Sequence, residues 1–585
     1  DNNLPHISGV PIQARHFCFL SSPAVLQAPS FPLPVLTFPF SHFPFSIIFI
    51  IFAVIMKQKN TPKINKAPQT TTKEKKQPLL LPVLPLLFIA TYLWAAWYFG
   101  DVLRMARERS FWVASTEQME FLLSQEFGGL WYVGRLMLSL FRYPWIGALL
   151  PATMITWGTW CLGYGMRLTA RWRWIQYLPA GAYLLWMAYE GVNLFFEHES
   201  GKILGIPLCA TIILTIWAIM IASFSRKKSP AIITIPKDET ALQNRLQLLM
   251  IVTVFATHVV VDKVWRPYTR VIASMNVSML NSDWQGMMET ARKNADLSYR
   301  PIAANYAIAL VNTNQICERL YDIRLDYDPM FIHNRSSEGI VQELSLYQED
   351  CDYYAGFIQT CIHHAMERIT MIGPNIHSME LLTKCALMTG EWEVAKKYLR
   401  ILKDVPFEKE FVEKYSAYVG KPETVNADKE MAFIRQLEPI HDSFENEYQQ
   451  PVFLGYNAAL TEGRSKNALM NSLAVCMYSK SMPAFMMRTQ PLEGTMPPEN
   501  VADALCLMTS KDPDIMRRFP NLQYRHQKLA TTLGEMKPYM KDRPGFAREL
   551  FPKYKGYYPY YYFFGNLKAT RKSQKNEGSS TAGVN

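Results

Sequence analysis

Long apolar runs alternate with short polar connections through residues 78–265. Five runs have 20 residues or more with at most two formal charges, at residues 78–100, 143–166, 174–196, 203–224 and 246–265. An α-helix needs about 20 residues to cross the roughly 30 Å hydrocarbon core of a bilayer. The pattern therefore predicts a transmembrane domain of five helices.

The last run, at residues 246–265, is the weakest of the five. Only residues 246–261 are free of charge, because Asp262 and Lys263 follow. The crossing is complete if these two residues lie in the far headgroup layer and Trp265 anchors at the interface, as Trp commonly does. We expect this run to cross the membrane. Whether it crosses decides which compartment contains residues 266–585.

Residues 266–565 have the pattern of soluble amphipathic helices. The clearest unit covers residues 377–406, where two helical segments meet at a turn on Gly390 and Glu391. The second segment carries an apolar residue at every third or fourth position: Trp392, Ala395, Leu399 and Leu402. Such a stripe buries one face of a helix against a partner. We expect an all-α domain of packed helix pairs with Trp392 in its core.

This helix pair resembles a tetratricopeptide repeat, and residues 283–310 match the same pattern in part. The order of parts and the aromatic segment YKGYYPYYYFFG resemble a family of uncharacterised bacterial polytopic membrane proteins that end in an extracytoplasmic helical-repeat domain. The resemblance implies an irregular α-solenoid over residues 266–565, with the number of repeats open. It implies no known activity.

The excess of basic residues belongs to the membrane half. The chain has 61 Lys and Arg against 50 Asp and Glu, but residues 266–585 hold 38 against 37. A nucleic-acid partner is therefore not expected. Three connections, at residues 57–77, 167–173 and 225–245, carry fifteen basic residues, and the alternate connections, at residues 101–130 and 197–202, carry four. By the positive-inside rule the N-terminus is cytoplasmic, and five crossings place the C-terminal domain in the periplasm of a bacterium.

Both ends of the chain differ from the rest. Residues 1–55 contain no Met, and Met56 opens a polar, Lys-rich segment. We interpret residues 1–77 as lying outside the core, with translation starting at Met56 and residues 1–55 not part of the native protein. The alternative is an anchor or signal built on residues 44–56. Residues 566–585 are polar, and we predict that they are disordered.

Two ionisable residues lie within or near the ends of predicted spans. Glu190 is in the third run and His258 in the fifth. Ionisable groups at such depth are costly and often functional, so both are intramembrane polar candidates. The alternative for each is a hydrated interface or a simple interhelical hydrogen bond.

Motifs that carry chemistry are absent from the sequence. His363, His364 and Glu367 share a predicted helix, but adjacent histidines point in different directions and no further ligand pair stands nearby in sequence. We therefore assign no metal site. Phosphate-binding loops, nucleophile elbows, zinc-protease motifs and dinucleotide fingerprints do not occur, so no cofactor and no catalytic residue is assigned.

Cysteines and aromatic residues of the C-terminal half have structural interpretations. Six cysteines, none in a CxxC pair, are expected to be buried apolar side chains, with pairing in an oxidising periplasm as the alternative: Cys317, Cys351, Cys361, Cys385, Cys476 and Cys506. Residues 554–564 hold eight aromatics. We expect them to cap the open end of the solenoid; stacking on sugars or insertion at a membrane interface are the alternatives.

These features favour a membrane-anchored binding or scaffold protein of the cell envelope that presents helical repeats to protein partners. The alternative is a membrane enzyme of envelope polymer or lipid-linked sugar chemistry. Such enzymes resemble one another in having more spans and an acidic pair in the first outer loop. The loop here offers four separate acids: Glu108, Glu117, Glu120 and Glu126.

The charge asymmetry gives a topology prediction. A reporter enzyme that is active only outside the cytoplasm, fused after Leu310, should be active, because fifteen basic residues hold the opposite connections inside. Activity of the fusion in whole cells is the measurement. A cytoplasmic signal would mean that residues 246–265 do not cross.

Overall fold

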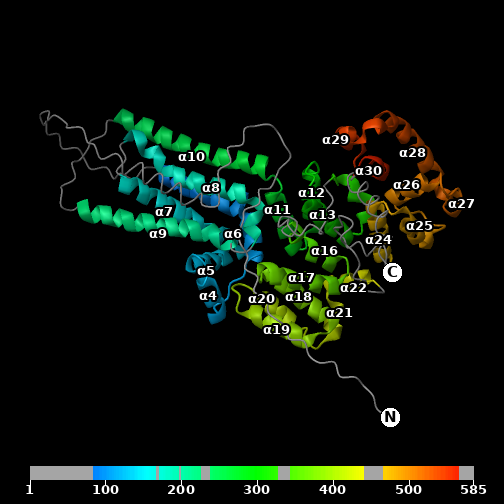
Figure 1. Cartoon of the computed structure of the whole chain (residues 1–585), viewed down its shortest axis with the longest axis horizontal. Coiled ribbons are helices and arrows are strands. Elements are labelled where there is room, and N and C mark those ends of the chain that lie inside the picture. Colours follow the sequence, from blue (N-terminus) through cyan, green and yellow to red (C-terminus); the bar gives the residue numbers. More distant parts are fainter. Residues whose placement is uncertain are drawn as a thin grey trace, which may run out of the picture. The chain divides into compact units, whose positions relative to one another are not determined.

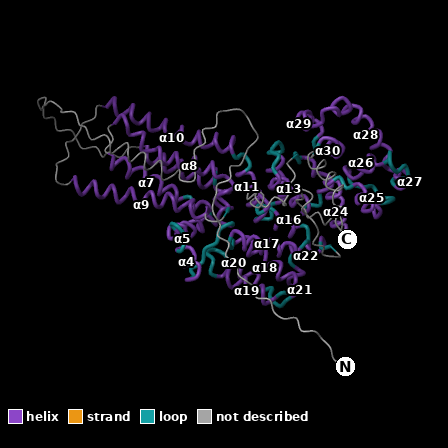
Figure 2. Tube along the Cα trace, in the orientation of Figure 1, coloured by secondary structure: helices purple, strands orange, loops and turns teal. Residues whose placement is uncertain are grey.

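The computed structural model describes residues 83–166, 170–196, 199–225, 237–326, 343–439 and 465–565. Every regular element in these ranges is a helix, so the predicted all-α class is confirmed (Figures 1 and 2). Predictions about residues 1–77 and 566–585, including the start at Met56, fall outside the described residues. The described residues all belong to one compact unit.

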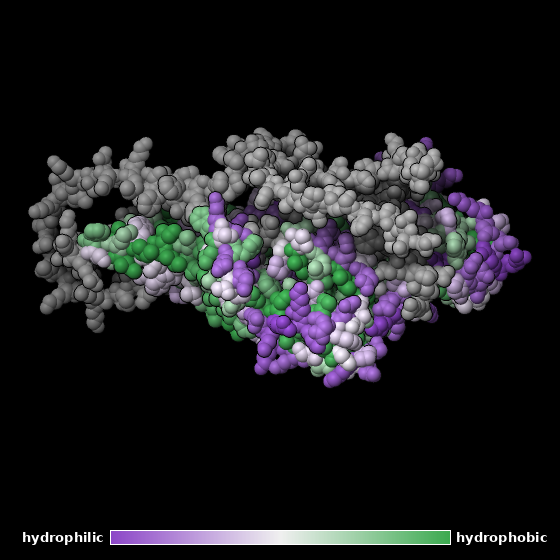
Figure 3. Space-filling model, turned by 60° about the horizontal axis from the view of Figure 1, so that its bottom comes forward, coloured by the Kyte–Doolittle hydropathy of each residue, from purple (hydrophilic) through white to green (hydrophobic). Residues whose placement is uncertain are grey.

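Within the described ranges, three helices are long and apolar enough to cross a membrane. The candidate spans are Pro144–Met166, Ser200–Phe224 and Asn244–Trp265. They lie in α6 (Pro144–Gly147) and α7 (Leu149–Met166), α9 (Glu199–Ser225) and α10 (Lys237–Trp265). Figure 3 shows apolar surface at the elongated end of the molecule, and α9 exposes isoleucines such as Ile216 and Ile219. The second, fourth and fifth predicted runs thus form membrane-compatible helices.

The first predicted run is helical where it is described, from Val83 to Tyr98, and a second helix follows it after a sharp bend. α2 (Val83–Leu93) continues through a π-helical turn, η2 (Trp94–Tyr98), and meets α3 (Gly100–Glu108) at 60°. A π-turn widens the helix, and such insertions are a common cause of sharp kinks. Counted as one broken span, this pair raises the number of candidate spans to four.

The third predicted run, residues 174–196, does not form one long helix. It consists of the 3₁₀ helix η4 (Ala170–Tyr177), the 13-residue α8 (Leu178–Glu190) and the 3₁₀ helix η5 (Gly191–Phe195). Pro179 lies in the first turn of α8, and Gly191 ends it with a φ of +57°. The prediction of five long spanning helices is therefore not met among the described residues. A count of apolar residues could not detect the two breaks on either side of α8.

Small residues let the membrane helices approach closely. α5 (Gly128–Leu138), from the predicted outer loop, packs along α9. A Cβ atom on Gly134 would lie 2.1 Å from the carbonyl oxygen of Gly201, so only glycine fits there. α4 (Thr116–Leu123), from the same loop, exposes Phe121 and Leu123.

Short helices follow one another through the C-terminal half. Before residue 327 they are α11 (Thr269–Leu280), α12 (Trp284–Lys293), α13 (Arg300–Asn312) and α14 (Ile316–Arg319). Next come α16 (Gln348–Tyr354), α17 (Ile358–Ile372), α18 (Ile376–Thr389), α19 (Trp392–Lys403), α20 (Lys409–Ser416), α21 (Pro422–Ala427) and α22 (Lys429–Leu437). The last are α24 (Lys466–Ser479), α25 (Met482–Thr489), α26 (Glu499–Met508), α27 (Ile515–Arg518), α28 (Gln523–Met536), α29 (Arg543–Tyr554) and α30 (Tyr558–Phe564).

The predicted helix pair at residues 377–406 is present as α18 and α19. Gly390 ends α18 in the left-handed conformation, with a φ of +77°, which glycine adopts without strain. Ala395, Leu399 and Leu402 are buried as the stripe predicts. Trp392 is only partly buried, because it is the first residue of α19 and lies at the edge of the core. This corrects the expectation that its ring lies inside the core.

The aromatic segment near the C-terminus packs inward. Tyr558 and Tyr561 of α30 are buried, and their hydroxyl groups donate hydrogen bonds to carbonyl oxygens of Met477 and Tyr478 in α24. One apolar cluster extends from Trp94 of the first span to these tyrosines. All eight described cysteines are free thiols, and seven of them are buried.

Leu402 should contribute far more stability than its neighbour on the surface. It is fully buried, so Leu402→Ala should destabilise the protein by about 2–5 kcal/mol through lost burial and a residual cavity. Lys403→Ala, on the exposed side, should change stability by less than about 0.5 kcal/mol. The measurement is thermal unfolding of the full-length protein in detergent. Equal melting temperatures for the two variants would contradict this core.

Candidate functional site

His258, the first intramembrane candidate, bridges three helical elements. Trp94 of η2 donates its indole N–H to Nε2 of His258 at 2.9 Å. Nε2 therefore accepts, and Nδ1 carries the proton that is donated to the carbonyl oxygen of Leu184 in α8, at 2.7 Å. His258 has no exposed surface. Both nitrogens are thus used to join the broken first span to α8 and α10.

One turn further along α10, Asp262 makes a second polar contact with the break. Its Oδ2 accepts hydrogen bonds from the Tyr98 hydroxyl at 2.9 Å and from Nε of Arg270 at 2.7 Å. The Arg270 guanidinium also lies 4.1 Å from the centre of the Tyr98 ring. Asp262 is buried, so its charge is met by Arg270 of α11 and not by the headgroup layer that the sequence suggested.

Glu190, the second candidate, lies apart from this group at the end of α8. Its two oxygens accept hydrogen bonds from the Trp186 indole at 3.0 Å and from the Asn193 amide at 3.3 Å. These partners lie within four residues of it in the chain. They hold the break between α8 and η5, and the structure does not bring Glu190 to His258.

The largest group of buried charges was not foreseen from the sequence. α3 leads from the first span into the C-terminal helices, and its Arg107 is buried against Glu408, with its other end on Glu108 at 2.9 Å. Arg107 also donates to the carbonyl oxygen of Pro406 at 3.0 Å. One signal was visible: the run Arg107, Glu108, Arg109 lies seven residues after the end of the first apolar run.

Arg109 meets the acidic residues of α16. It lies 2.6 Å from Glu349 and 3.4 Å from Asp350. Arg368 of α17 is 2.5 Å from Glu349, and Nε2 of His377 in α18 is 2.6 Å from Asp350. All five side chains are buried. This network, which we call the α16 ion cluster, joins α3, α16, α17 and α18.

The cluster fixes the charge of its carboxylates. Burial alone would raise the pKa of Glu349, but Arg368, Arg109 and His377 hold that pKa below its usual value. Burial likewise opposes ionisation of Asp350, and His377 and Arg109 lower its pKa. Both carboxylates are therefore ionised at neutral pH.

Glu380 has the opposite environment. Burial raises its pKa well above the usual range, and the nearby carboxylates of Glu408 and Glu108 raise it further. The protonated, neutral form of Glu380 is therefore favoured far more than in an ordinary glutamate. One turn away, Lys384 pairs with Glu430 at 2.8 Å, and this partner raises the pKa of the lysine although burial acts against it.

A cavity of about 300 Å³ opens beside this cluster. Residues of α11, α16, α18, α20 and α22 line it, together with Arg142. Its charged and titratable lining residues are Arg142, Asp350, His377, Glu380, Lys384, Glu410, Lys414 and Glu430, and its aromatic ones are Tyr354, Phe411 and Tyr415. Positive and negative groups therefore both face the space.

Comparison with known proteins identifies the family of the chain. A family model matches residues 194–565, more than half of the sequence. The chain belongs to DUF6057, a family of unknown function. The DUF6057 match includes α9, α10 and every helix of the C-terminal half that contributes to the cavity, whereas α3 and Arg142 precede it. No curated protein and no solved structure matches the chain.

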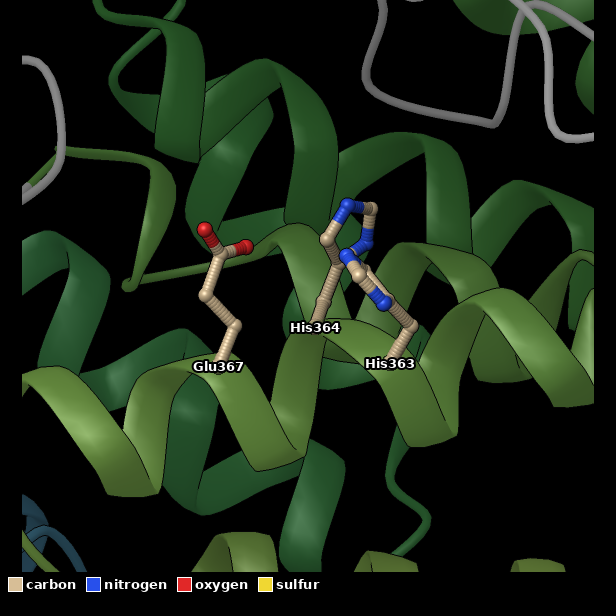
Figure 4. Close-up of side chains that lie close together, drawn as sticks. All are labelled: His363, His364 and Glu367. Carbon is tan, nitrogen blue, oxygen red and sulfur yellow. The ribbon is translucent and has the colours of Figure 1, made fainter. Parts of the chain in front are cut away.

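In the part of this DUF6057 member that the structure describes, two groups of side chains have metal-ligand chemistry. Glu349, Asp350 and His377 place ligand atoms within 4.8 Å of one another. Arg109 and Arg368 already contact these carboxylates, and a cation there would face two guanidinium groups, so a metal does not fit. The second group is His363, His364 and Glu367, which project from α17 on one side (Figure 4).

The four acids of the predicted outer loop do not form one site. Glu108 is buried beside Arg107, whereas Glu117, Glu120 and Glu126 are exposed on α4 or just after it. The structure does not bring these three acids to the cavity.

Removing Arg109 should destabilise the whole junction. Arg109→Leu leaves Glu349 and Asp350 buried with less positive charge, and breaking a buried pair in this way costs about 3–5 kcal/mol. Arg517→Leu, which removes an exposed ion pair, should cost less than about 1 kcal/mol. Melting temperatures of the full-length variants test this. Similar temperatures would show that the cluster does not hold α3.

The same cluster should make the protein sensitive to acid. Folding lowers the pKa of Glu349 and Asp350, so at mildly acidic pH the unfolded chain binds more protons than the folded one. Their stabilisation is present above the ordinary carboxyl pKa of about 4 and is lost as the pH falls through the lower folded values. The melting temperature of the wild type should fall over this range more steeply than that of Arg109→Leu.

Proposed function

We propose that this protein is a membrane-anchored binding or scaffold protein of the bacterial cell envelope, in which the C-terminal helical domain lies in the periplasm and takes a protein partner. The observation that carries the proposal is the charged cavity beside the α16 ion cluster. It is a concave site with a few convergent polar groups and perturbed pKa values, which is the usual character of a binding site.

The proposed topology keeps the segment of η4, α8 and η5 as a crossing. Its 3₁₀ portions rise about 2.0 Å per residue and its α portion about 1.5 Å, which gives about 45 Å in total if the three are aligned. That length exceeds the roughly 30 Å core of a bilayer. α8 packs beside α10 in the same bundle (Figure 1). Together with the bent first pair and three long helices this makes five crossings, consistent with the charge asymmetry.

The proposed architecture of the binding domain is an irregular α-solenoid. Its support is the order of packing, because α11 contacts α12, α12 contacts α13, and α16, α17, α18 and α19 each contact the next helix. A solenoid is built from such contacts between neighbours and presents an extended surface to partners.

The cavity lining favours a polar segment of a protein as the occupant. Asp350 is matched by His377 and Arg109, and Glu430 by Lys384, so the ionised groups deep in the site are already neutralised. A lipid acyl chain would lose these polar contacts without replacing them. A polar loop with both donors and acceptors satisfies a mixed lining.

One observation favours an enzyme as the second candidate. Asp350 is held ionised and Glu380 is held neutral in the same cavity, and such divergent carboxyl groups serve as acid and base in many enzymes. The binding function is preferred because Asp350 is engaged by His377 at 2.6 Å and by Arg109 at 3.4 Å, which leaves it a poor base.

A photo-crosslinking residue at the cavity rim tests the proposal. Glu410 lines the cavity and is exposed, and Tyr524 is 75% exposed on α28, away from the cavity lining. p-Benzoylphenylalanine in place of Glu410 should give one defined covalent adduct in living cells, and in place of Tyr524 it should not. Adding Lys414→Glu should reduce the adduct by at least about tenfold, a loss of roughly 1.4 kcal/mol. An adduct only at position 524 would contradict the cavity as the binding site.

Glu380→Gln separates binding from catalysis. Glutamine keeps the shape of a neutral acid but cannot release a proton, so a binding protein should retain both the adduct and its cellular function. An enzyme that uses Glu380 as its acid should lose function while the adduct persists. The matched control is Glu289→Gln, an exposed glutamate on α12 outside the cavity lining.

A further inference from the structure

We propose that His363, His364 and Glu367 of α17 form a Zn²⁺ site, with Asp352 of α16 as the positioning residue that orients His364. The site lies outside the cavity lining, and the inference does not depend on the proposed function. The sequence assigned no metal here because adjacent histidines diverge on a helix. The structure adds a buried partner from a second helix, and this partner changes the geometry.

The three candidate ligands share one side of α17. Glu367 follows His363 by four residues and His364 by three, and these spacings place side chains on one face of a helix. Figure 4 shows both imidazoles and the carboxylate rising from the same side of the ribbon. Their ligand atoms lie within 4.8 Å of one another. His363 and Glu367 are exposed, so a cation can reach this side of α17 from the solvent.

Asp352 fixes the ring of His364. Its Oδ2 is 2.6 Å from Nδ1 of His364, and both side chains are at least nine-tenths buried. The buried carboxylate accepts the Nδ1 proton, so Nε2 is the nitrogen that presents its lone pair. Metal-ligating histidines almost always have this arrangement, in which a carboxylate or carbonyl holds the other ring nitrogen.

Gln348 marks the direction of that lone pair. Its amide nitrogen lies 3.0 Å from Nε2 of His364, where an amide N–H donates to the ring. A bound cation would replace this weaker contact, and the amide side chain would turn aside. Gln348 and Asp352 both belong to α16, so the same short helix carries the orienting carboxylate of this site and the acids of the α16 ion cluster.

The donor set selects the metal. Two imidazole nitrogens and one carboxylate oxygen suit Zn²⁺, with bonds of about 2.0–2.2 Å. Ca²⁺ and Mg²⁺ prefer oxygen ligands alone. At tetrahedral zinc two ligand atoms lie about 3.3 Å apart, so the exposed side chains must close by up to about 1.5 Å. Three protein ligands leave a fourth position open to water or to a ligand from a partner.

Metal titration of the full-length protein in detergent tests the site. The protein is purified with a tag that lacks histidine, stripped with EDTA and titrated with Co²⁺, whose visible absorption reports tetrahedral coordination, and then with Zn²⁺ as the competitor. The wild type should bind one more equivalent than His363→Ala or Glu367→Gln. The control variants His526→Ala and Glu289→Gln remove an exposed histidine and an exposed glutamate elsewhere, and they should match the wild type.

Asp352→Asn tests the orienting role. It should keep one equivalent of metal but weaken its affinity by about 10–100-fold, as loss of an outer carboxylate typically does. Because Asp352 is buried, the melting temperature of this variant is measured alongside, and Glu367→Gln at the surface carries the test if Asp352→Asn does not fold. Identical titrations for the wild type, His363→Ala and Glu367→Gln would overturn the proposal, as would a wild type that binds no Co²⁺.

Discussion

The need to neutralise charges that are removed from water governs the junction between the first span and the C-terminal helices. Arg107 and Arg109 are carried into the interior by α3, where an unpaired guanidinium would cost several kcal/mol. Glu408 of the loop before α20 and Glu349 of α16 meet them there. These pairs fix the direction of α3 after the bend. One apolar core extends from Trp94 to the tyrosines of α30.

The same balance of charge shapes the cavity beside the junction. The arginines pair with Glu408 and Glu349, whereas burial and the carboxylates of Glu408 and Glu108 raise the pKa of Glu380 more than Lys384 lowers it. The cavity therefore contains Glu380 with a raised pKa, Asp350 in contact with His377, and the Lys384–Glu430 pair. Groups of this kind bind polar ligands by hydrogen bonds and do not impose one sign of charge on them.

Polar residues in the membrane segment have a comparable role. The π-turn from Trp94 to Tyr98 interrupts the first span, and its two aromatic donors meet His258 and Asp262 of α10. A polar group at membrane depth is tolerated when its partners lie within the protein. His258 and Asp262 of α10 therefore stabilise the bend, and the bend supplies the hydrogen-bond donors that these two buried residues need.

The sequence by itself determined the helical class and the helix pair α18 and α19. It also determined that four of the five apolar runs form membrane-compatible helices, if the bent pair counts as one span. These features are local, because an apolar run or a stripe at every third or fourth residue is visible in a short window. The buried position of Leu402 followed from the same periodicity, whereas the edge position of Trp392 did not, because it depends on where α19 begins.

Tertiary structure alone decided the site. Arg109 and Glu349 are 240 residues apart in the chain, and Trp94 and His258 are 164 apart. Asp352 and His364 lie on separate helices, so the sequence showed two diverging histidines and not an oriented ligand. The spacing of residues along the chain does not encode such pairings. Each pair forms only after burial has removed water from both side chains, so that each polar group is the remaining partner of the other.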